Sequence, residues 1–75
     1  MQYIKKYQLG VDVKRWRERH NFSQFELAAC SGLTPAYVSS VERFQSDNLE
    51  FRGLSLLCDA IGVDVREYIT DKEGE

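Results

Sequence analysis

The chain lacks the features that mark membrane, secreted and metal-binding proteins. No apolar run approaches the roughly 20 residues that span a bilayer, and the opening segment MQYIKKYQLG has no apolar stretch typical of a signal peptide. The two cysteines, Cys30 and Cys58, form neither a disulfide framework nor a metal-ligand spacing. The sequence therefore predicts a cytoplasmic protein with reduced thiols, no membrane partner and no bound metal.

Catalytic residues are equally scarce. His20 is the only histidine, no Ser-His-Asp arrangement can be assembled, and the carboxylates fall at helix caps and on polar faces. A chain of 75 residues also leaves little room for a substrate pocket. We therefore expect no enzymatic activity, no cofactor and no small-molecule ligand.

The length and composition fit one small folded domain. The chain has 75 residues, a single proline and 43% hydrophobic residues, which argues against disorder. A domain this short buries only about 60% of its unfolded surface, so its stability is marginal. Association with a second copy would add buried area.

Charge is distributed unevenly along the chain. The formal net charge is −2, but residues 1–20 carry six basic and two acidic side chains, whereas residues 44–75 carry three basic and eight acidic ones. A basic face for nucleic acid is therefore compatible with the negative net charge of the chain. The net charge nevertheless predicts modest non-specific affinity for DNA.

Polar residues divide the chain into short helices. Ser23 and Glu26 form a capping-box pattern, and Thr34 followed by Pro35 is a second helix start. Asn21 tolerates the left-handed conformation that ends helices. Together with apolar periodicity, these signals predict an all-α fold with little or no sheet and helices over residues 11–20, 24–30, 35–43, 50–61 and 65–69. The segment QYIKKY remains open between a loose arm, an extra helical turn and a short strand.

Residues 23–43 carry a specific pattern. Two capped helices joined by Ser31–Gly32–Leu33 are the arrangement of two steeply crossing helices. The segment SQFELAACSGLTPAYVSSVER resembles the helix-turn-helix of the Cro and phage-repressor type, often called the XRE family. The matching positions are Ser23, Gln24, Leu27, Ala28, Gly32, Leu33, Thr34, Tyr37, Val38, Ser39 and Glu42.

The resemblance extends over residues 9 to about 70 and implies a five-helix, lambda-repressor-like DNA-binding domain. Residues 1–8 would then be an N-terminal arm and residues 71–75 an acidic tail. It also implies that Arg17 and Glu42 form a structural ion pair between the first and third helices. The residues expected at double-stranded DNA are Gln24, Thr34, Pro35, Ala36, Tyr37, Ser39, Ser40 and Arg43.

Two positions depart from the family pattern. Phe44 stands where members usually have glycine, and Leu49 where they often have proline, so the loop after the recognition helix could follow another path. The recognition helix also lacks the Arg, Gln and Asn side chains that read bases through two hydrogen bonds. Part of the specificity is therefore expected from DNA shape, from Arg43 or from the basic N-terminus.

These observations predict a sequence-specific transcription regulator that binds a palindromic operator as a dimer. A Cro-like repressor and a restriction–modification controller protein both fit this description. The alternative is an antitoxin-like interaction module that binds a protein partner as well as its own operator. The residues expected at the dimer interface are Leu56, Val65, Tyr68 and Ile69.

Overall fold

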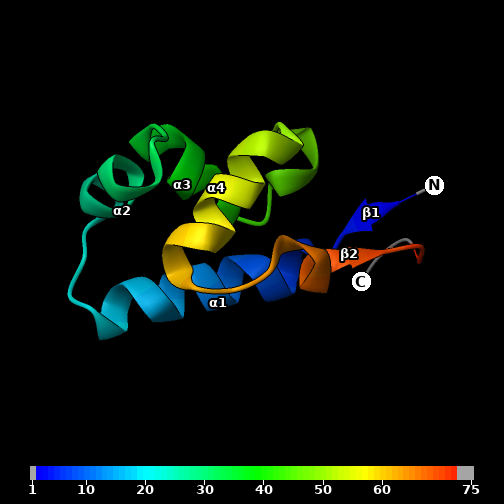
Figure 1. Ribbon diagram of the computed structural model, residues 1–75, viewed down its shortest axis with the longest axis horizontal. Coiled ribbons are helices and arrows are strands. Elements are labelled where there is room, and N and C mark those ends of the chain that lie inside the picture. The colour runs from blue at the N-terminus through cyan, green and yellow to red at the C-terminus, as the bar shows by residue number, and fades with distance from the viewer. Residues whose placement is uncertain (1, 73–75) are drawn as a thin grey trace.

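The structure, a computed structural model, describes residues 2–72 and is mostly helical (Figure 1). The α-helices are α1 (Lys6–Arg19), α2 (Gln24–Ser31), α3 (Pro35–Glu42) and α4 (Phe51–Ile61). Two short 3-10 helices precede and follow α4, namely η1 (Ser46–Asn48) and η2 (Val65–Tyr68). A minimal antiparallel sheet joins β1 (Tyr3–Ile4) to β2 (Ile69–Thr70).

The core is built from one apolar stripe on each α-helix. Helix α3 packs against both α1 and α2, and α2 also packs against α4. In Figure 1, the paired strands lie at one end of the molecule and α2 lies at the other. The buried apolar residues are Leu9, Val13, Leu27, Ala28, Val38, Val41, Leu54, Leu57, Cys58, Ile61 and Tyr68.

Local capping signals explain where the central helices begin. The Ser23 hydroxyl accepts from the Glu26 N–H, and the Glu26 carboxylate accepts from the Ser23 N–H, which confirms the capping box. The Thr34 hydroxyl accepts from the Tyr37 N–H at the start of α3. Asn21 adopts a φ of 55°, the left-handed conformation expected after the first helix.

The two ends of the chain differ from the sequence-based expectation. The expected fifth helix over residues 65–69 is a single 3-10 turn followed by a strand, because Ile69 pairs with Ile4 instead of continuing a helix. The Lys5 N–H donates to the Tyr68 carbonyl at 2.7 Å. The first helix begins at Lys6, so the expected boundary between an arm and the domain at residue 9 falls inside α1.

The expected acidic tail extends beyond the described residues, which end at position 72. Among residues 2–72, every helix is too short or too polar to cross a membrane.

Candidate nucleic-acid interface

Helices α2 and α3 form a helix-turn-helix unit. Gly32 ends α2 with a φ of 74°, a left-handed conformation that costs little without a side chain. Its N–H and that of Leu33 donate to the carbonyls of Ala29 and Ala28. The buried Ser31 hydroxyl bonds back to the Leu27 carbonyl at 2.8 Å. The turn therefore satisfies its own polar groups and holds the start of α3 at a fixed angle to α2.

One side of α3 faces the core and the other reaches the surface. Val38 and Val41 are fully buried, which fixes the rotation of the helix about its axis. Thr34, Ala36 and Arg43 are exposed. Seven of the eight residues expected at DNA thus lie on α3 or cap its ends, and Gln24 lies on α2. The four on α3 besides Ala36 are half-buried: Pro35, Tyr37, Ser39 and Ser40.

A partly buried polar network ties α3 to α1 and α2. The Glu42 carboxylate accepts from Arg17 Nε at 2.7 Å and from Arg17 Nη2 at 3.0 Å. Arg17 Nη1 also donates to the Phe22 carbonyl at 2.9 Å. The hydrogen bond to Glu42 raises the pKa of the Arg17 guanidinium. The ion pair expected from the resemblance is thus present, and it fixes the C-terminal end of the recognition helix.

Gln24 belongs to the same network. Its Nε2 donates to Glu42 Oε1 at 3.3 Å from the first position of α2. The side-chain amide therefore braces α3. Gln24 also stands at the start of α2, and backbone N–H groups at a helix start favour an anion.

Tyr37 joins the recognition helix to α4. Its hydroxyl donates to the Glu50 carbonyl at 2.6 Å. The ring lies so close to Gly53 that a Cβ built at position 53 would overlap the ring and hydroxyl. Burial, followed by the charge of Glu50, raises the pKa of Tyr37 to about 12. Sequence reasoning missed the need for glycine at position 53, because the contact joins two helices.

The loop after α3 begins with a strained residue. Phe44 adopts a φ of 64°, a conformation that costs a non-glycine residue about 1–2 kcal/mol. Its ring lies 4.9 Å from the Tyr7 ring and also covers Gly10 of α1. This geometry accounts for the glycine usual in the XRE pattern, and in this chain the Phe44 side chain packs against α1.

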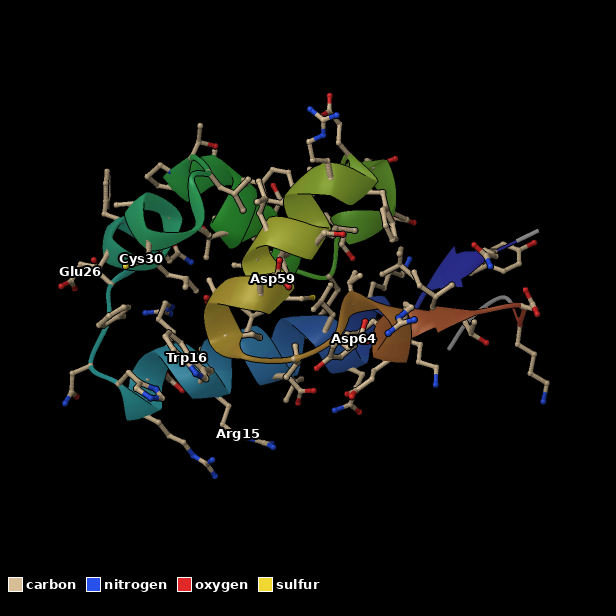
Figure 2. All side chains as sticks on the ribbon, in the orientation of Figure 1. Arg15, Trp16, Glu26, Cys30, Asp59 and Asp64 are labelled. Atoms are coloured by element: carbon tan, nitrogen blue, oxygen red, sulfur yellow. The ribbon has the colours of Figure 1, made fainter. Side chains whose placement is uncertain are left out.

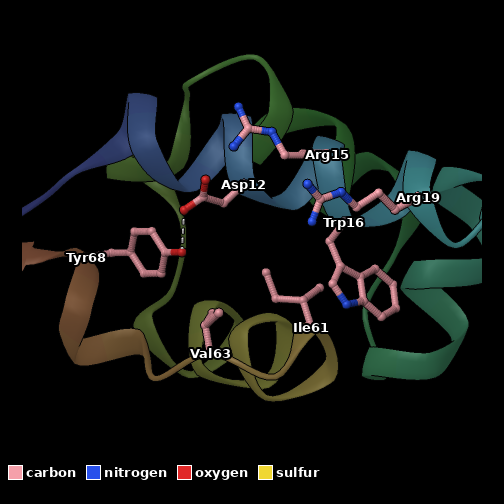
Figure 3. A pocket seen from close by; sticks show the side chains of 7 residues that line it. All are labelled: Asp12, Arg15, Trp16, Arg19, Ile61, Val63 and Tyr68. Carbon is pink, nitrogen blue, oxygen red and sulfur yellow. Dashed lines mark hydrogen bonds between the residues drawn. The ribbon is translucent and has the colours of Figure 1, made fainter.

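The four residues expected at a dimer interface do not share one environment. Leu56 is exposed, with 41% of its surface accessible, and Val65 and Ile69 are half-buried. Tyr68, in contrast, is only 3% exposed, and its hydroxyl donates to Asp12 Oδ2 at 2.7 Å (Figure 3). The structure therefore places Tyr68 in the core, where its hydrogen bond connects η2 to α1.

A pocket and two cysteines lie outside the set of residues expected at DNA. A shallow pocket of about 210 Å³ lies between α1 and the segment after α4, with Trp16 and Ile61 in its lining (Figure 3). Residues 2–72 contain no cluster of His, Cys, Asp and Glu that could hold a metal ion. Cys30 is exposed on α2 (Figure 2), whereas burial raises the pKa of the Cys58 thiol to about 11.

Comparison with known proteins identifies several relatives. Control protein C.SmaI from Serratia marcescens is 36% identical over 62 residues, which are 83% of this chain and 73% of that protein. The restriction–modification controller protein C.AhdI from Aeromonas hydrophila has 32% identity and a TM-score of 0.67, covering 83% of this chain and 92% of that one. A variant of the controller protein C.Esp1396I has 25% identity and a TM-score of 0.66, covering 85% and 80% of the two chains. No family model matches the sequence.

Proposed function

Because this chain belongs to the XRE-type helix-turn-helix family that includes the control proteins, we propose that it regulates transcription as a dimer bound to a palindromic operator. The genes that it controls are those of a restriction–modification system. This part of the proposal is supported by the names of the relatives at 36% and 32% identity.

The observation that carries the proposal is the exposed side of α3. Ala36 lies on α3, and Thr34 and Arg43 are the residues that cap its two ends; the helix is braced near one end by Glu42 and near the other by Tyr37. A helix held in this way enters the major groove as one rigid unit. Thr34 and Arg43 would contact phosphates, while the Ala36 methyl group would contact a thymine methyl.

The dimer follows from the small number of base contacts. Ala36, Ser39 and Ser40 offer two or three contacts, each worth about 1–3 kcal/mol of discrimination at best. Single methyl and hydroxyl groups lie at the low end of this range, so one copy falls short of the roughly 10³-fold preference typical of specific binding. Two copies related by a two-fold axis would double the contacts and read half-sites about one helical turn apart.

The dimer surface proposed here is the exposed part of the C-terminal half. Leu56 is accessible on α4, and Val65 and Ile69 are half-buried on the segment that follows it in the chain. Tyr68 is left out of this surface because its side chain is used inside the protomer.

The direct test measures binding to duplexes selected by this protein from a random pool, across a series of salt concentrations. Arg43→Ala should weaken binding to selected and random duplexes alike and lower the salt slope by about 0.9, the value for one lost phosphate contact. Ala36→Gln should change which sequences are selected, because it adds a side chain that reads adenine.

Lys72→Ala removes one positive charge from an exposed residue near the C-terminus and serves as the control. It should leave the salt slope and the selected sequence unchanged. The proposed DNA face is wrong if Arg43→Ala binds both kinds of duplex as tightly as the wild-type protein.

A further inference from the structure

The outer face of α4 has a simple arrangement of charges. Arg52 and Asp59 are both exposed and seven residues apart, so they lie in line along one side of the helix, roughly 10 Å from each other. Leu56 and the half-buried Ser55 lie between them, on either side of this line. We call these four residues the α4 face. Its opposite side consists of Leu54, Leu57, Cys58 and Ile61, which are buried in the core.

The order of the two charges opposes the helix dipole. Arg52 is in the first turn of α4 and Asp59 in the last three residues, whereas the dipole favours acidic side chains at the start and basic ones at the end. Helix α2 follows that preference at its start, with Glu26 in the first turn. Helix α1 follows it at its end, with Arg17 and Arg19 in the last turn, although it begins with Lys6. Neither Arg52 nor Asp59 forms an ion pair with another group among residues 2–72. Local helix stability therefore does not explain this arrangement.

A second copy of the same face complements it. A two-fold axis that passes between Ser55 and Leu56 turns α4 end for end, so that Arg52 of one protomer lies opposite Asp59 of the other. The same operation brings the two copies of Leu56 into contact with each other at the centre. Two symmetric ion pairs would then flank an apolar contact.

From this self-complementarity we infer that two copies of the chain pack α4 against α4 in an antiparallel manner, with Arg52 of each protomer paired to Asp59 of its partner. The inference rests on the dimer put forward above and specifies its register. Two grooves border the face and leave room for the partner helix. One lies beside Leu56 and is lined by Leu33, Leu49 and Arg52, and the other lies beside Ser55 and Asp59.

Charge reversal tests this register. In Arg52→Asp alone, two acidic groups face each other at both ends of the interface, and in Asp59→Arg alone two basic groups do. Each variant should dimerise about tenfold more weakly than the wild-type protein, since two attractive pairs become repulsive. Both changes agree with the helix dipole, so α4 itself should remain folded. Dimerisation is measured by sedimentation equilibrium of the full chain.

Mixing the two variants gives the decisive measurement. In a heterodimer of Arg52→Asp with Asp59→Arg, an acidic group faces a basic group at both ends. An equimolar mixture should therefore regain wild-type affinity, and native mass spectrometry should detect mostly heterodimer. The double variant R52D/D59R should also dimerise normally. Arg15→Asp and Glu18→Arg make the same charge changes on the exposed side of α1 and should have no effect.

Three results would contradict the inference. If the single variants dimerise as tightly as the wild-type protein, or if the mixture does not regain affinity, the register is wrong while the dimer itself stands. If the wild-type protein stays monomeric at every concentration, with and without a selected duplex, the dimer of the proposed function fails as well. Should a reversal unfold the protomer, Arg52→Gln and Asp59→Asn remove the attraction alone and should each weaken dimerisation severalfold.

Discussion

The ion pair between Arg17 and Glu42 allows the stability of the recognition helix to be tested by removing one partner. The Glu42 side chain is 6% exposed and receives three hydrogen bonds, two from Arg17 and one from Gln24. Glu42→Ala would leave the Arg17 guanidinium, 17% exposed, with only its bond to the Phe22 carbonyl. Uncompensated buried charges of this kind cost about 3–5 kcal/mol, and the residual exposure of Arg17 favours the lower end.

A loss of about 3 kcal/mol is large for this chain, because a 75-residue domain has a total stability of roughly 4–11 kcal/mol. It should lower the melting temperature by at least about 12 °C. Urea unfolding followed by far-ultraviolet circular dichroism measures the free energy, and thermal unfolding gives the temperature. The control is the double variant Arg17→Met with Glu42→Leu, which removes both charges and should lose much less stability than Glu42→Ala. A loss below about 0.5 kcal/mol for Glu42→Ala would refute the reasoning, since that is the range of ordinary surface substitutions.

Two further predictions concern close packing and pH. Gly10→Ala should destabilise the protein by about 1–2 kcal/mol, as measured by urea unfolding, despite alanine's higher helix propensity. The reason is that the new Cβ would lie 2.6 Å from the Val41 carbonyl oxygen and 2.7 Å from the Phe44 ring. An increase in stability would contradict this close contact. Burial, followed by the hydrogen bond to Asp12, raises the pKa of Tyr68 above its usual value. The stability from protonated Tyr68 is therefore complete below about pH 10 and is lost as the pH rises further, and Tyr68→Phe should show a smaller decline over that range; an equal decline in both proteins would exclude Tyr68 as its source.

Local signals allowed much of the helix-turn-helix to be predicted from the sequence. The caps at Ser23 and Thr34 bond to groups only three residues away, so their partners can be identified without knowing the fold. Gly32 is similarly local, since a left-handed residue must follow α2 before the chain can turn. The pairing of Arg17 with Glu42 came from the XRE pattern, not from spacing.

The parts that were missed depend on contacts between distant segments. The sequence around Tyr68 looks the same whether the side chain faces a partner or the core. Its hydrogen bond to Asp12, which places it in the core, becomes apparent only in the folded structure. The close approach of Tyr37 to Gly53 and the pairing of Ile4 with Ile69 are of the same kind. The last segment was expected to be helical because no local signal in VREYI reveals the strand that it meets.

The small sheet formed by β1 and β2 also bears on the order in which the domain folds. Its pairing of Tyr3 with Thr70 closes almost the whole chain into one loop, whereas the contacts between α2 and α3 close only a few residues. The entropy lost on closing a flexible loop grows with its length, so short-range contacts are favoured early and the sheet is favoured last. The turn that orients α3 can therefore form before the ends of the chain meet, and fraying of the strands would leave the recognition helix in place.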